Sequence, residues 1–347
     1  MYMQMDFFGA ANGYSGFRSY FNRIFNSEDF DRIYVIKGGP GTGKSSFMKK
    51  ICSRYQDGDF KIERIHCSSD PESLDGVIIT SDDKKIALLD GTAPHERDAV
   101  VVSAIDEIVN LAEGLDRRFL SAEKEEILSL SKEKKRAYDT AYAYLGIAGE
   151  AEKFKKSKCM FHIDKKFRNK IKKLAEIKKT SLGSGRNVRL ISSFGAKGKV
   201  KFDTIEAISK TTYSIPNNHC HASTIMDEIA KVAIEEDADA LVCHAPLDAG
   251  IEAIYFPSSG VSFIIGDKGE KIPADGYFPA PQKIDTETLK KANEISKSAL
   301  EESRRWFEIA SDFHFRLEEK YIRAMDFSYC DEVFGRKTKE IDELFKR

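Results

Sequence analysis

The segment Gly38–Ser45 reads GGPGTGKS and matches the pattern G-x-x-x-x-G-K-[ST]. The residues before it, Ile33–Ile36, are β-branched or aromatic, which is typical of a buried strand. The residues after it, Ser45–Cys52, have helical spacing of apolar side chains. The side chains expected to face inward are Phe47, Met48, Ile51 and Cys52. A glycine-rich loop between a strand and a helix is the arrangement in which this motif binds phosphate groups.

The chemistry of this loop follows from its residue types. Glycines reach the dihedral angles that turn backbone N–H groups toward an anion, and the following helix adds the positive end of its dipole. Lys44 supplies a positive charge for the β- and γ-phosphates, and the Ser45 hydroxyl is a ligand for Mg²⁺. We therefore expect ATP and Mg²⁺ as cofactors. The expected nucleotide-binding residues are Gly38, Gly39, Pro40, Gly41, Thr42, Gly43, Lys44, Ser45 and Ser46.

A second element is expected to hold the magnesium ion. Residues Ile86–Asp90 are four apolar residues followed by a carboxylate, which is the Walker B pattern of P-loop NTPases. Ser45 and Asp90 are therefore the predicted metal ligands. The alternative is a buried strand whose aspartate only begins a turn with Gly91.

Further candidates follow a strand predicted over Lys61–Cys67. Because the ends of parallel strands share one edge of a sheet, Asp70, Asp75 and His95 are expected near the phosphates, where they could activate water or an acceptor hydroxyl. The alternative for Asp70 is a turn or cap role, since it precedes a proline. The predicted catalytic set is Lys44, Asp70, Asp75, Asp90 and His95.

Several features indicate which base the nucleotide carries, but they do not identify the reaction. Gly91 follows Asp90 where many P-loop ATPases place a catalytic glutamate, and neither N-K-x-D nor a D-x-x-G after Asp90 is present. This argues against a Ras-like GTPase and favours adenine. Three functions stay open: a slow ATPase, a small-molecule or nucleotide kinase, and a non-hydrolysing, nucleotide-gated nucleic-acid binder. In a kinase, the base would be Asp70 or Asp75 and the lid cations Arg97, Arg117 and Arg118.

The composition indicates a globular protein of about two domains. The chain has 347 residues, of which 32% are charged and 41% apolar, and no apolar run is long enough to cross a membrane. The six cysteines are scattered, and the first residues resemble no secretion signal. We therefore expect a reduced, cytoplasmic protein without a membrane segment.

Charge is unevenly distributed, although the net charge is only −1. Residues 153–201 contain 17 basic and two acidic residues, with apolar residues at mostly helical spacing. We interpret this stretch as a basic amphipathic helix. It either pairs with the acidic run Glu123–Glu133 of a preceding antiparallel helix or offers a surface to nucleic acid or another polyanion.

The sequence also repeats itself. Residues 64–70 (RIHCSSD) align with 242–248 (VCHAPLD), and residues 8–10 (FGA) align with 194–196. In the helical parts, Ile147-Ala148 aligns with Ile309-Ala310. We interpret these matches as an internal duplication, with the two halves packed as a pseudo-dimer within one chain, which would allow the chain to be monomeric.

The glycine loop is not repeated in the second half. Asn217–Thr224 stands at the aligned position, with Ser223 in place of Lys44. Without the glycine conformations and the lysine, the second half is expected to bind no nucleotide. The alternative is a soft-metal site, although its adjacent residues converge poorly on one ion. Its ligands would come from His219, Cys220, His221, Cys243 and His244.

The strings GGPGTGKS, HCSSDPESLDG and LLDGTAPH resemble an uncharacterised bacterial family of P-loop ATPases with two tandem P-loop halves and helical extensions. The resemblance covers essentially the whole chain, and it implies ATP binding without naming a substrate or partner. It also suggests a P-loop in each half, from which this chain departs at Asn217–Thr224.

The expected fold class is α/β, with two P-loop NTPase-type three-layer domains that each precede a charged helical extension. The first P-loop domain is expected at 1–115 and its basic helical extension at 116–180. A degenerate P-loop-like domain is expected at 181–283 and the C-terminal helical extension at 284–347.

Overall fold

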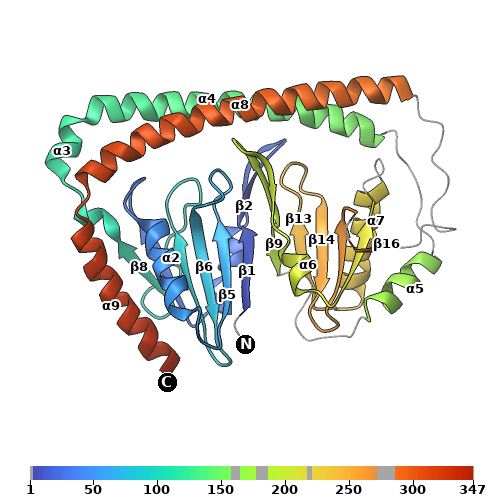
Figure 1. Cartoon of the computed structure of the whole chain (residues 1–347), viewed down its shortest axis with the longest axis horizontal. Helices are drawn as coiled ribbons and strands as arrows, with labels where there is room; N and C mark the ends of the chain where they lie inside the picture. Colours follow the sequence, from blue (N-terminus) through green and yellow to red (C-terminus); the bar gives the residue numbers. More distant parts are fainter. Residues whose placement is uncertain are drawn as a thin grey trace.

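The computed structural model describes residues 3–157, 165–176, 187–216, 221–267, 269–271 and 286–346. These residues form two mixed α/β halves beneath a pair of long helices (Figure 1). The first half contains β1 (Met3–Phe8), β2 (Ala10–Gly13), β3 (Gly16–Ser19), α1 (Phe21–Ile24), η1 (Ser27–Asp29), β4 (Arg32–Lys37), α2 (Lys44–Tyr55), β5 (Lys61–His66), β6 (Leu74–Thr80), β7 (Lys85–Asp90), β8 (Asp106–Asn110) and η2 (Leu111–Gly114).

The first sheet has the strand order β1-β5-β6-β7-β4-β8. The strands predicted over 33–36, 61–67 and 86–90 are confirmed as β4, β5 and β7, and α2 buries the four predicted apolar side chains together with Tyr55. Strand β6 was not expected, and it runs antiparallel to both neighbours. Its Val77–Ile79 run is fully buried, because both faces of the sheet are covered.

The second half repeats this order of elements. It contains β9 (Val188–Arg189), β10 (Ser192–Gly195), β11 (Gly198–Lys201), α6 (Thr204–Ile208), β12 (Thr211–Ile215), α7 (His221–Glu235), β13 (Leu241–His244), β14 (Ile251–Phe256), β15 (Val261–Ile265) and β16 (Glu270–Lys271). The sheet order, β16-β12-β15-β14-β13-β9, matches the first sheet when it is read from the other end. The strand β14 is antiparallel to both neighbours, as β6 is.

The two halves meet through their edge strands and share one core. The Phe8 N–H donates to the Leu190 carbonyl at 2.7 Å, and the Leu190 N–H donates to the Phe8 carbonyl at 3.2 Å. Phe7 and Ile33 of the first half lie in the same buried cluster as Ile205 of the second. The expectation of a helix layer on both faces of each sheet is therefore corrected. The face opposite α2 packs against α1 and the other half, so it needs no second long helix.

A long helix from each half lies over both sheets. These helices are α4 (Lys124–Ser157), preceded by α3 (Arg117–Ala122), and α8 (Thr286–Ala324), and they run antiparallel in Figure 1. Ala141 and Leu145 of α4 are buried with Phe307 of α8 and Phe194 of β10. The helix pair is thus fixed to the hairpin β10–β11 as well as to itself.

The helix that follows each long helix packs on the opposite half. After α4, α5 (Lys165–Leu174) buries Phe167 and Ile171 against α7. After α8, α9 (Phe327–Lys346) buries Val333 and Ile341 in the core that surrounds α2. Figure 1 shows α9 beside the first sheet and α5 beside the second. The two halves therefore exchange their terminal helices.

The partner of the basic segment differs from the expected one. Arg168 of α5 pairs with Glu228 at 2.8 Å and with Glu235 at 2.6 Å, both on α7. Of the expected acidic run, Glu123 and Glu126 instead bind Lys320 of α8. Basic residues of the segment that form ion pairs are Lys153, Lys155, Lys156, Arg168, Lys172, Arg189, Lys197, Lys199 and Lys201.

Across the part of the chain that the structure describes, no helix combines the length and the apolar composition that a membrane crossing requires.

Candidate functional site

The loop between β4 and α2 needs glycine at two positions. Gly41 has a φ of 69° and Gly43 a φ of 85°, in the left-handed region that side chains disfavour. A Cβ on Gly38 would clash with the Thr42 side chain, whose Oγ1 donates to the Gly39 carbonyl at 2.9 Å. The loop is therefore a compact turn that leads into α2, in which the main chain of the glycines has close neighbours and no room for side chains.

Lys44 is the first residue of α2 and folds back over the loop. Its Nζ donates to the carbonyl oxygens of Gly38 at 3.0 Å and Gly39 at 2.7 Å, and lies 3.6 Å from Asp90 Oδ2. The side chain is 10% exposed. Neutral carbonyls are weaker partners for an ammonium group than anionic oxygens, so an anion held in the loop could take their place.

Asp90 ends β7, beside Ile36 of β4. Its Oδ1 accepts hydrogen bonds from the Thr92 backbone N–H at 2.9 Å and the Thr92 hydroxyl at 2.6 Å. Burial raises the pKa of this carboxyl, and Lys44 and Thr92 act in the opposite direction. Asp90 thus begins a turn through Oδ1, which agrees with the alternative to a metal ligand. Its Oδ2 faces Lys44.

The predicted partner of Asp90 in holding a metal is Ser45. Its Oγ accepts a hydrogen bond from the Leu74 backbone N–H at 2.9 Å, whereas Ser46 is exposed on α2. The described residues contain no group of three or more His, Cys, Asp or Glu side chains arranged to hold a metal ion. One hydroxyl and one carboxylate suit Mg²⁺, which takes few protein ligands and completes its shell with phosphate oxygens and water.

Asp75 and His95 form a buried pair next to Asp90. His95 Nε2 lies 2.9 Å from Asp75 Oδ2, and both residues are under 8% exposed. Gly76 of β6 pairs with Leu89 of β7, so the next residue on each strand is Asp75 and Asp90. The His95 ring stacks on Phe21 with a centroid separation of 4.4 Å, which fixes its plane. The structure therefore brings these two predicted residues together, beside Asp90.

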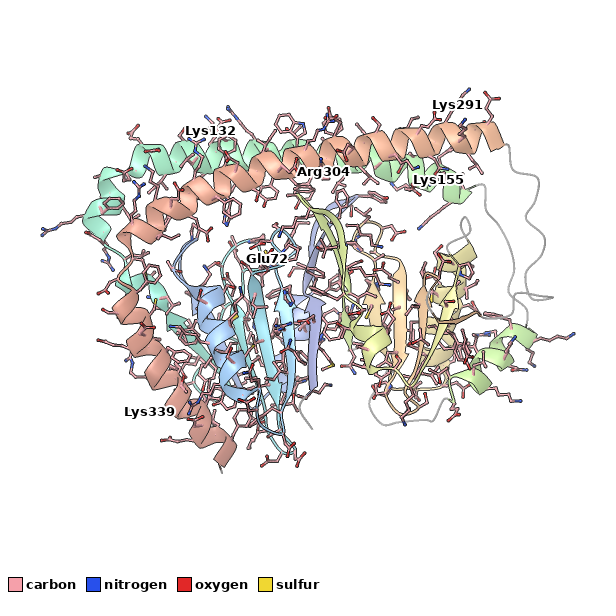
Figure 2. The ribbon with its side chains drawn as sticks, in the orientation of Figure 1. Glu72, Lys132, Lys155, Lys291, Arg304 and Lys339 are labelled. Carbon is pink, nitrogen blue, oxygen red and sulfur yellow. The ribbon has the colours of Figure 1, made fainter. Side chains whose placement is uncertain are left out.

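Asp70 has the turn role that was the alternative to a catalytic one. Its Oδ2 accepts from the Ser73 hydroxyl at 2.7 Å and its Oδ1 from the Glu72 backbone N–H at 3.3 Å. Lys197, at the tip of the other half's hairpin, pairs with Glu72 at 2.9 Å. Figure 2 shows Glu72 at the end of the first sheet that faces the helix pair. Asp70 thus shapes a turn at the edge of the site.

Helix α8 contributes residues to this site that the sequence did not suggest. A Cβ on Gly39 would lie 2.8 Å from the Tyr321 ring, and one on Gly41 would lie 2.9 Å from the Glu318 carbonyl oxygen. Burial and the charges of Lys134 and Lys44 lower the pKa of His314 to about 4. His314 and Glu318 are one helical turn apart, but nothing in their local sequence connects them to a loop nearly 280 residues earlier.

The lid cations expected for a kinase are not supported. Arg97 is buried, with its Nη2 at 3.1 Å from Asp106 and 2.9 Å from the Ser27 hydroxyl. Arg117 and Arg118 are exposed in the first turn of α3. Arg97 therefore stabilises the β8 region instead of reaching toward a ligand.

In the described part of the second half, no carboxylate stands at the position that corresponds to Asp90. By strand register, Ile265 takes the position of Asp90, since Ile265 pairs with Ile215 as Asp90 pairs with Ile36. Asn217 to Cys220 lie outside the described residues. Cys243 is buried, which raises the pKa of its thiol, and His244 Nδ1 contacts the Ala249 carbonyl at 2.9 Å. In the described residues these two do not belong to a metal-binding cluster.

Comparison with known proteins adds no neighbour: no family model, curated protein or solved structure matches this chain. The strand, glycine loop and helix around Lys44, with Asp90 alongside, are therefore the observations on which a function can be built.

Proposed function

We propose that this chain is a Mg-ATP-binding P-loop NTPase, acting as a slow ATPase whose cycle drives a conformational change. The nucleotide would bind only in the first half. The observation that carries this proposal is the loop geometry: left-handed glycines at Gly41 and Gly43 lead into a helix whose first residue, Lys44, faces Asp90.

The residues present fit such a ligand. Lys44 contacts the carbonyls of Gly38 and Gly39 and the carboxylate of Asp90, and phosphate oxygens are stronger partners for its ammonium group than the two neutral carbonyls. Ser45 and Asp90 would hold Mg²⁺, which when bound neutralises charge on the phosphate oxygens. The Gly38–Gly43 main chain would supply N–H donors to the phosphates.

The Asp75–His95 pair is the best candidate for activating a nucleophile. A carboxylate that orients an imidazole is a common arrangement for moving a proton, and this pair lies next to Asp90. Asp70 is less suited, because its oxygens already accept hydrogen bonds from its own turn. The proton could come from water or from an acceptor hydroxyl, which keeps a kinase as the second candidate.

We also infer that the two halves arose by internal duplication. The shared strand order and the antiparallel β6 and β14 support it. Ala148 and Ala310, aligned by sequence, are both fully buried, and their neighbours Ile147 and Ile309 are both exposed. Because α4 and α8 cover both halves, a change at the nucleotide would be transmitted to the whole chain.

A polyanion partner is not favoured as the main function. Nine of the 17 basic residues in 153–201 form ion pairs within the chain, and their partners include carboxylates on α4, α7 and both sheets. Three lysines of α5, which are Lys165, Lys166 and Lys173, are exposed and form no ion pair with the described residues.

The test is release of phosphate from ATP, with and without a panel of nucleosides and small alcohols as acceptors. We expect magnesium-dependent release without any acceptor, loss of this release in Lys44→Ala, and retention in Lys49→Ala, which removes an exposed lysine from the same helix. Phosphate transfer seen only with an acceptor would establish the kinase instead. Unchanged release in Lys44→Ala would refute the site.

A further inference from the structure

The inner face of α8 lies directly on the glycine loop. Gly39 touches Tyr321 and Gly41 touches Glu318 so closely that a methyl group at either position would not fit. At Gly41, the added Cβ would also lie 3.2 Å from Glu318 Cγ and 2.8 Å from Ile322 Cγ1. The loop surface expected to face phosphate is therefore covered by a side chain that ends in a carboxylate.

The electrostatic surroundings of Glu318 resemble those of a bound anion. Burial raises the pKa of its carboxyl, while the nearby Gly41 backbone amide and the charge of Lys44 lower it. A loop amide and the loop lysine are the groups that a phosphate would use. His314, one turn earlier, has a pKa of about 4 and is neutral at pH 7, so it does not offset this negative charge.

We propose that Glu318 determines the nucleotide affinity of this loop by acting as an internal anion that a triphosphate must displace. The inference rests on the proposed nucleotide site in the first half. One N–H group cannot serve a carboxylate and a phosphate oxygen at the same time, and two anions in one cradle repel each other. Binding therefore requires the Glu318 side chain to leave Gly41.

The second half shows the opposite arrangement of charge. Lys156 lies eight residues after Ala148, as Glu318 lies eight residues after Ala310. Lys156 pairs with Asp248 at 2.6 Å, and its charge also acts on Asp227 of α7. At the aligned position, one long helix therefore carries an anion beside the glycine loop, and the other carries a cation paired with Asp248.

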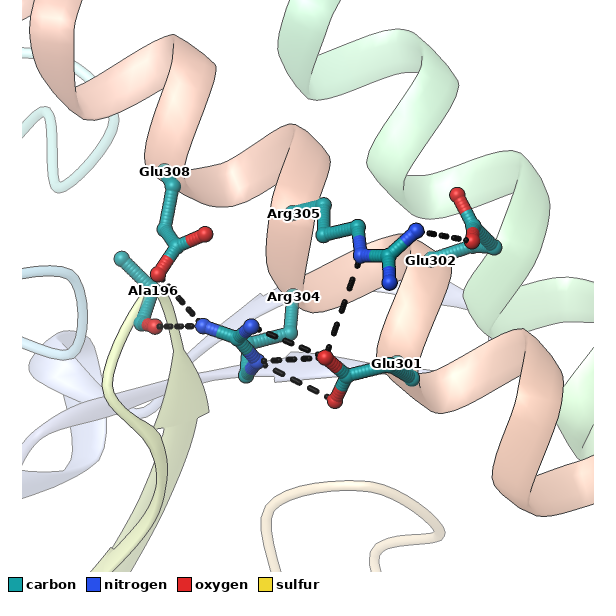
Figure 3. Close-up of polar contacts among 6 residues, drawn as sticks. All are labelled: Ala196, Glu301, Glu302, Arg304, Arg305 and Glu308. Carbon is teal, nitrogen blue, oxygen red and sulfur yellow. Dashed lines mark hydrogen bonds and ion pairs between the residues drawn. The ribbon is translucent and has the colours of Figure 1, made fainter.

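Displacement of Glu318 would affect ion pairs and hydrogen bonds farther along the helix pair α4 and α8. Two residues later, Lys320 holds Glu123 at 2.8 Å and Glu126 at 2.6 Å on the neighbouring helical segment. Farther along α8, Arg304 donates to the Ala196 carbonyl of the second half's hairpin at 3.3 Å and pairs with Glu301 and Glu308 (Figure 3). A shift of α8 at Glu318 would therefore alter the contacts that α8 makes with α4 and with the second half.

The test compares binding of a non-hydrolysable Mg-ATP analogue, and separately of inorganic tripolyphosphate, to four full-length chains. These are wild type, Glu318→Gln, Lys44→Ala and the matched control Glu319→Gln, which neutralises an exposed carboxylate on the same helix. Glu318→Gln keeps the size of the side chain and a neutral acceptor for Gly41. We expect it to bind both ligands about ten- to a hundredfold more tightly than wild type, as for loss of a charge-assisted hydrogen bond that competes with the ligand.

Hydrogen exchange over residues 314–322 provides a second readout. We expect it to increase when the analogue binds wild type, and to be higher already in Glu318→Gln without ligand. If Glu318→Gln is poorly folded, Glu318→Asp, which shortens the reach to Gly41, should tighten binding in the same direction.

The outcomes separate the two claims. If Glu318→Gln binds no more tightly than wild type while Lys44→Ala abolishes binding, the inference on Glu318 is wrong and the nucleotide site stands. If Glu319→Gln tightens binding equally, general charge and not the Gly41 contact is responsible, and the inference is also wrong. If wild type and Glu318→Gln both fail to bind either ligand, the nucleotide site and the inference fall together.

Discussion

The two halves of this chain share a framework but differ in the few residues that could do chemistry. Both have the same strand order, the same hairpin after the first strand and a helix after the central strand. The first half has Lys44 and Asp90 facing each other at 3.6 Å. The second has Ile265 at the register position of Asp90. A fold is maintained by the packing of many residues, whereas a phosphate site depends on only a few residues.

Residues that the halves do share are structural. His66 and His244 each end a strand and contact the carbonyl five residues later, Pro71 at 2.6 Å and Ala249 at 2.9 Å. His66 also contacts Asp6 at 2.9 Å, and this contact and Arg64 lower the Asp6 pKa to about 2 against the effect of burial. The repeated histidine therefore indicates a common way to close a loop, not a common reaction.

The exchange of terminal helices gives the largest expected effect on stability. Ile341 of α9 and Ile171 of α5 are both fully buried, in the cores around α2 and α7 respectively. Ile341→Ala and Ile171→Ala should each cost about 2–5 kcal/mol in free energy of unfolding. Hydrogen exchange should rise in α2 for the first variant and in α7 for the second.

The informative result is which half shows increased hydrogen exchange in each variant. If Ile341→Ala exposed α7, or if neither variant altered exchange in the opposite half, the exchanged arrangement of α5 and α9 would be incorrect. The wild-type chain and the exposed-surface variant Ile309→Ala provide the reference.

The next largest effect is expected on turnover, and it should appear when Asp90 is replaced but not when an acidic residue of the second half is replaced. Asp90→Asn should reduce turnover about ten- to a hundredfold at limiting magnesium, by the loss of one charged contact, and change nucleotide binding less. Asp267→Asn, an exposed position just after β15, is the control and should leave both unchanged. Full turnover in Asp90→Asn at limiting magnesium would remove Asp90 from the site.

The same substitution has a pH-dependent effect on stability. Because burial raises the pKa of Asp90, its stabilising contribution is present at low pH and is lost as pH rises through the raised pKa. The melting temperature of nucleotide-free Asp90→Asn, relative to wild type, should therefore be higher at pH 8 than at pH 4. A constant difference across this range would show that Asp90 is not held in an unfavourable environment.

The sequence predicted the secondary structure around the glycine loop well, but it did not predict the helix that lies on the loop. The loop 38–45, the strands on either side and the buried face of α2 follow from local spacing, which directly reflects dihedral preferences and burial. Strand β6 was missed because Leu74–Gly76 follows turn residues and contains an aspartate and a glycine. The register of Asp75 beside Asp90 depends on that strand, so it could not be derived.

Other features depend on contacts between distant segments. The alignment of residues 8–10 with 194–196 is wrong by four residues. Gly13 pairs with Gly16 at the turn of the first hairpin, and Gly195 pairs with Gly198 at the turn of the second, so Gly13 is the counterpart of Gly195. The partners of Arg168 on α7 and of Gly41 on α8 come from the exchange of helices between halves. No local pattern records such an exchange.

The smallest effect is expected at the basic helix. Lys165, Lys166 and Lys173 are exposed on α5, whereas its Arg168 pairs with Glu235 at the end of α7 and its Lys172 pairs with Glu236, the next residue. Three remaining charges give at most a weak, strongly salt-dependent affinity for DNA or RNA. Replacing all three by glutamate should abolish any binding seen at low salt without changing ATP turnover. Tight binding that persists at physiological salt would restore the polyanion alternative.

The central claim is that one half binds nucleotide and the other does not. Titration calorimetry with a non-hydrolysable Mg-ATP analogue measures this directly as the number of sites per chain. The account predicts a stoichiometry near one, abolished by Lys44→Ala. A stoichiometry near two, with one site surviving that substitution, would contradict it and make the second half a working site of different design.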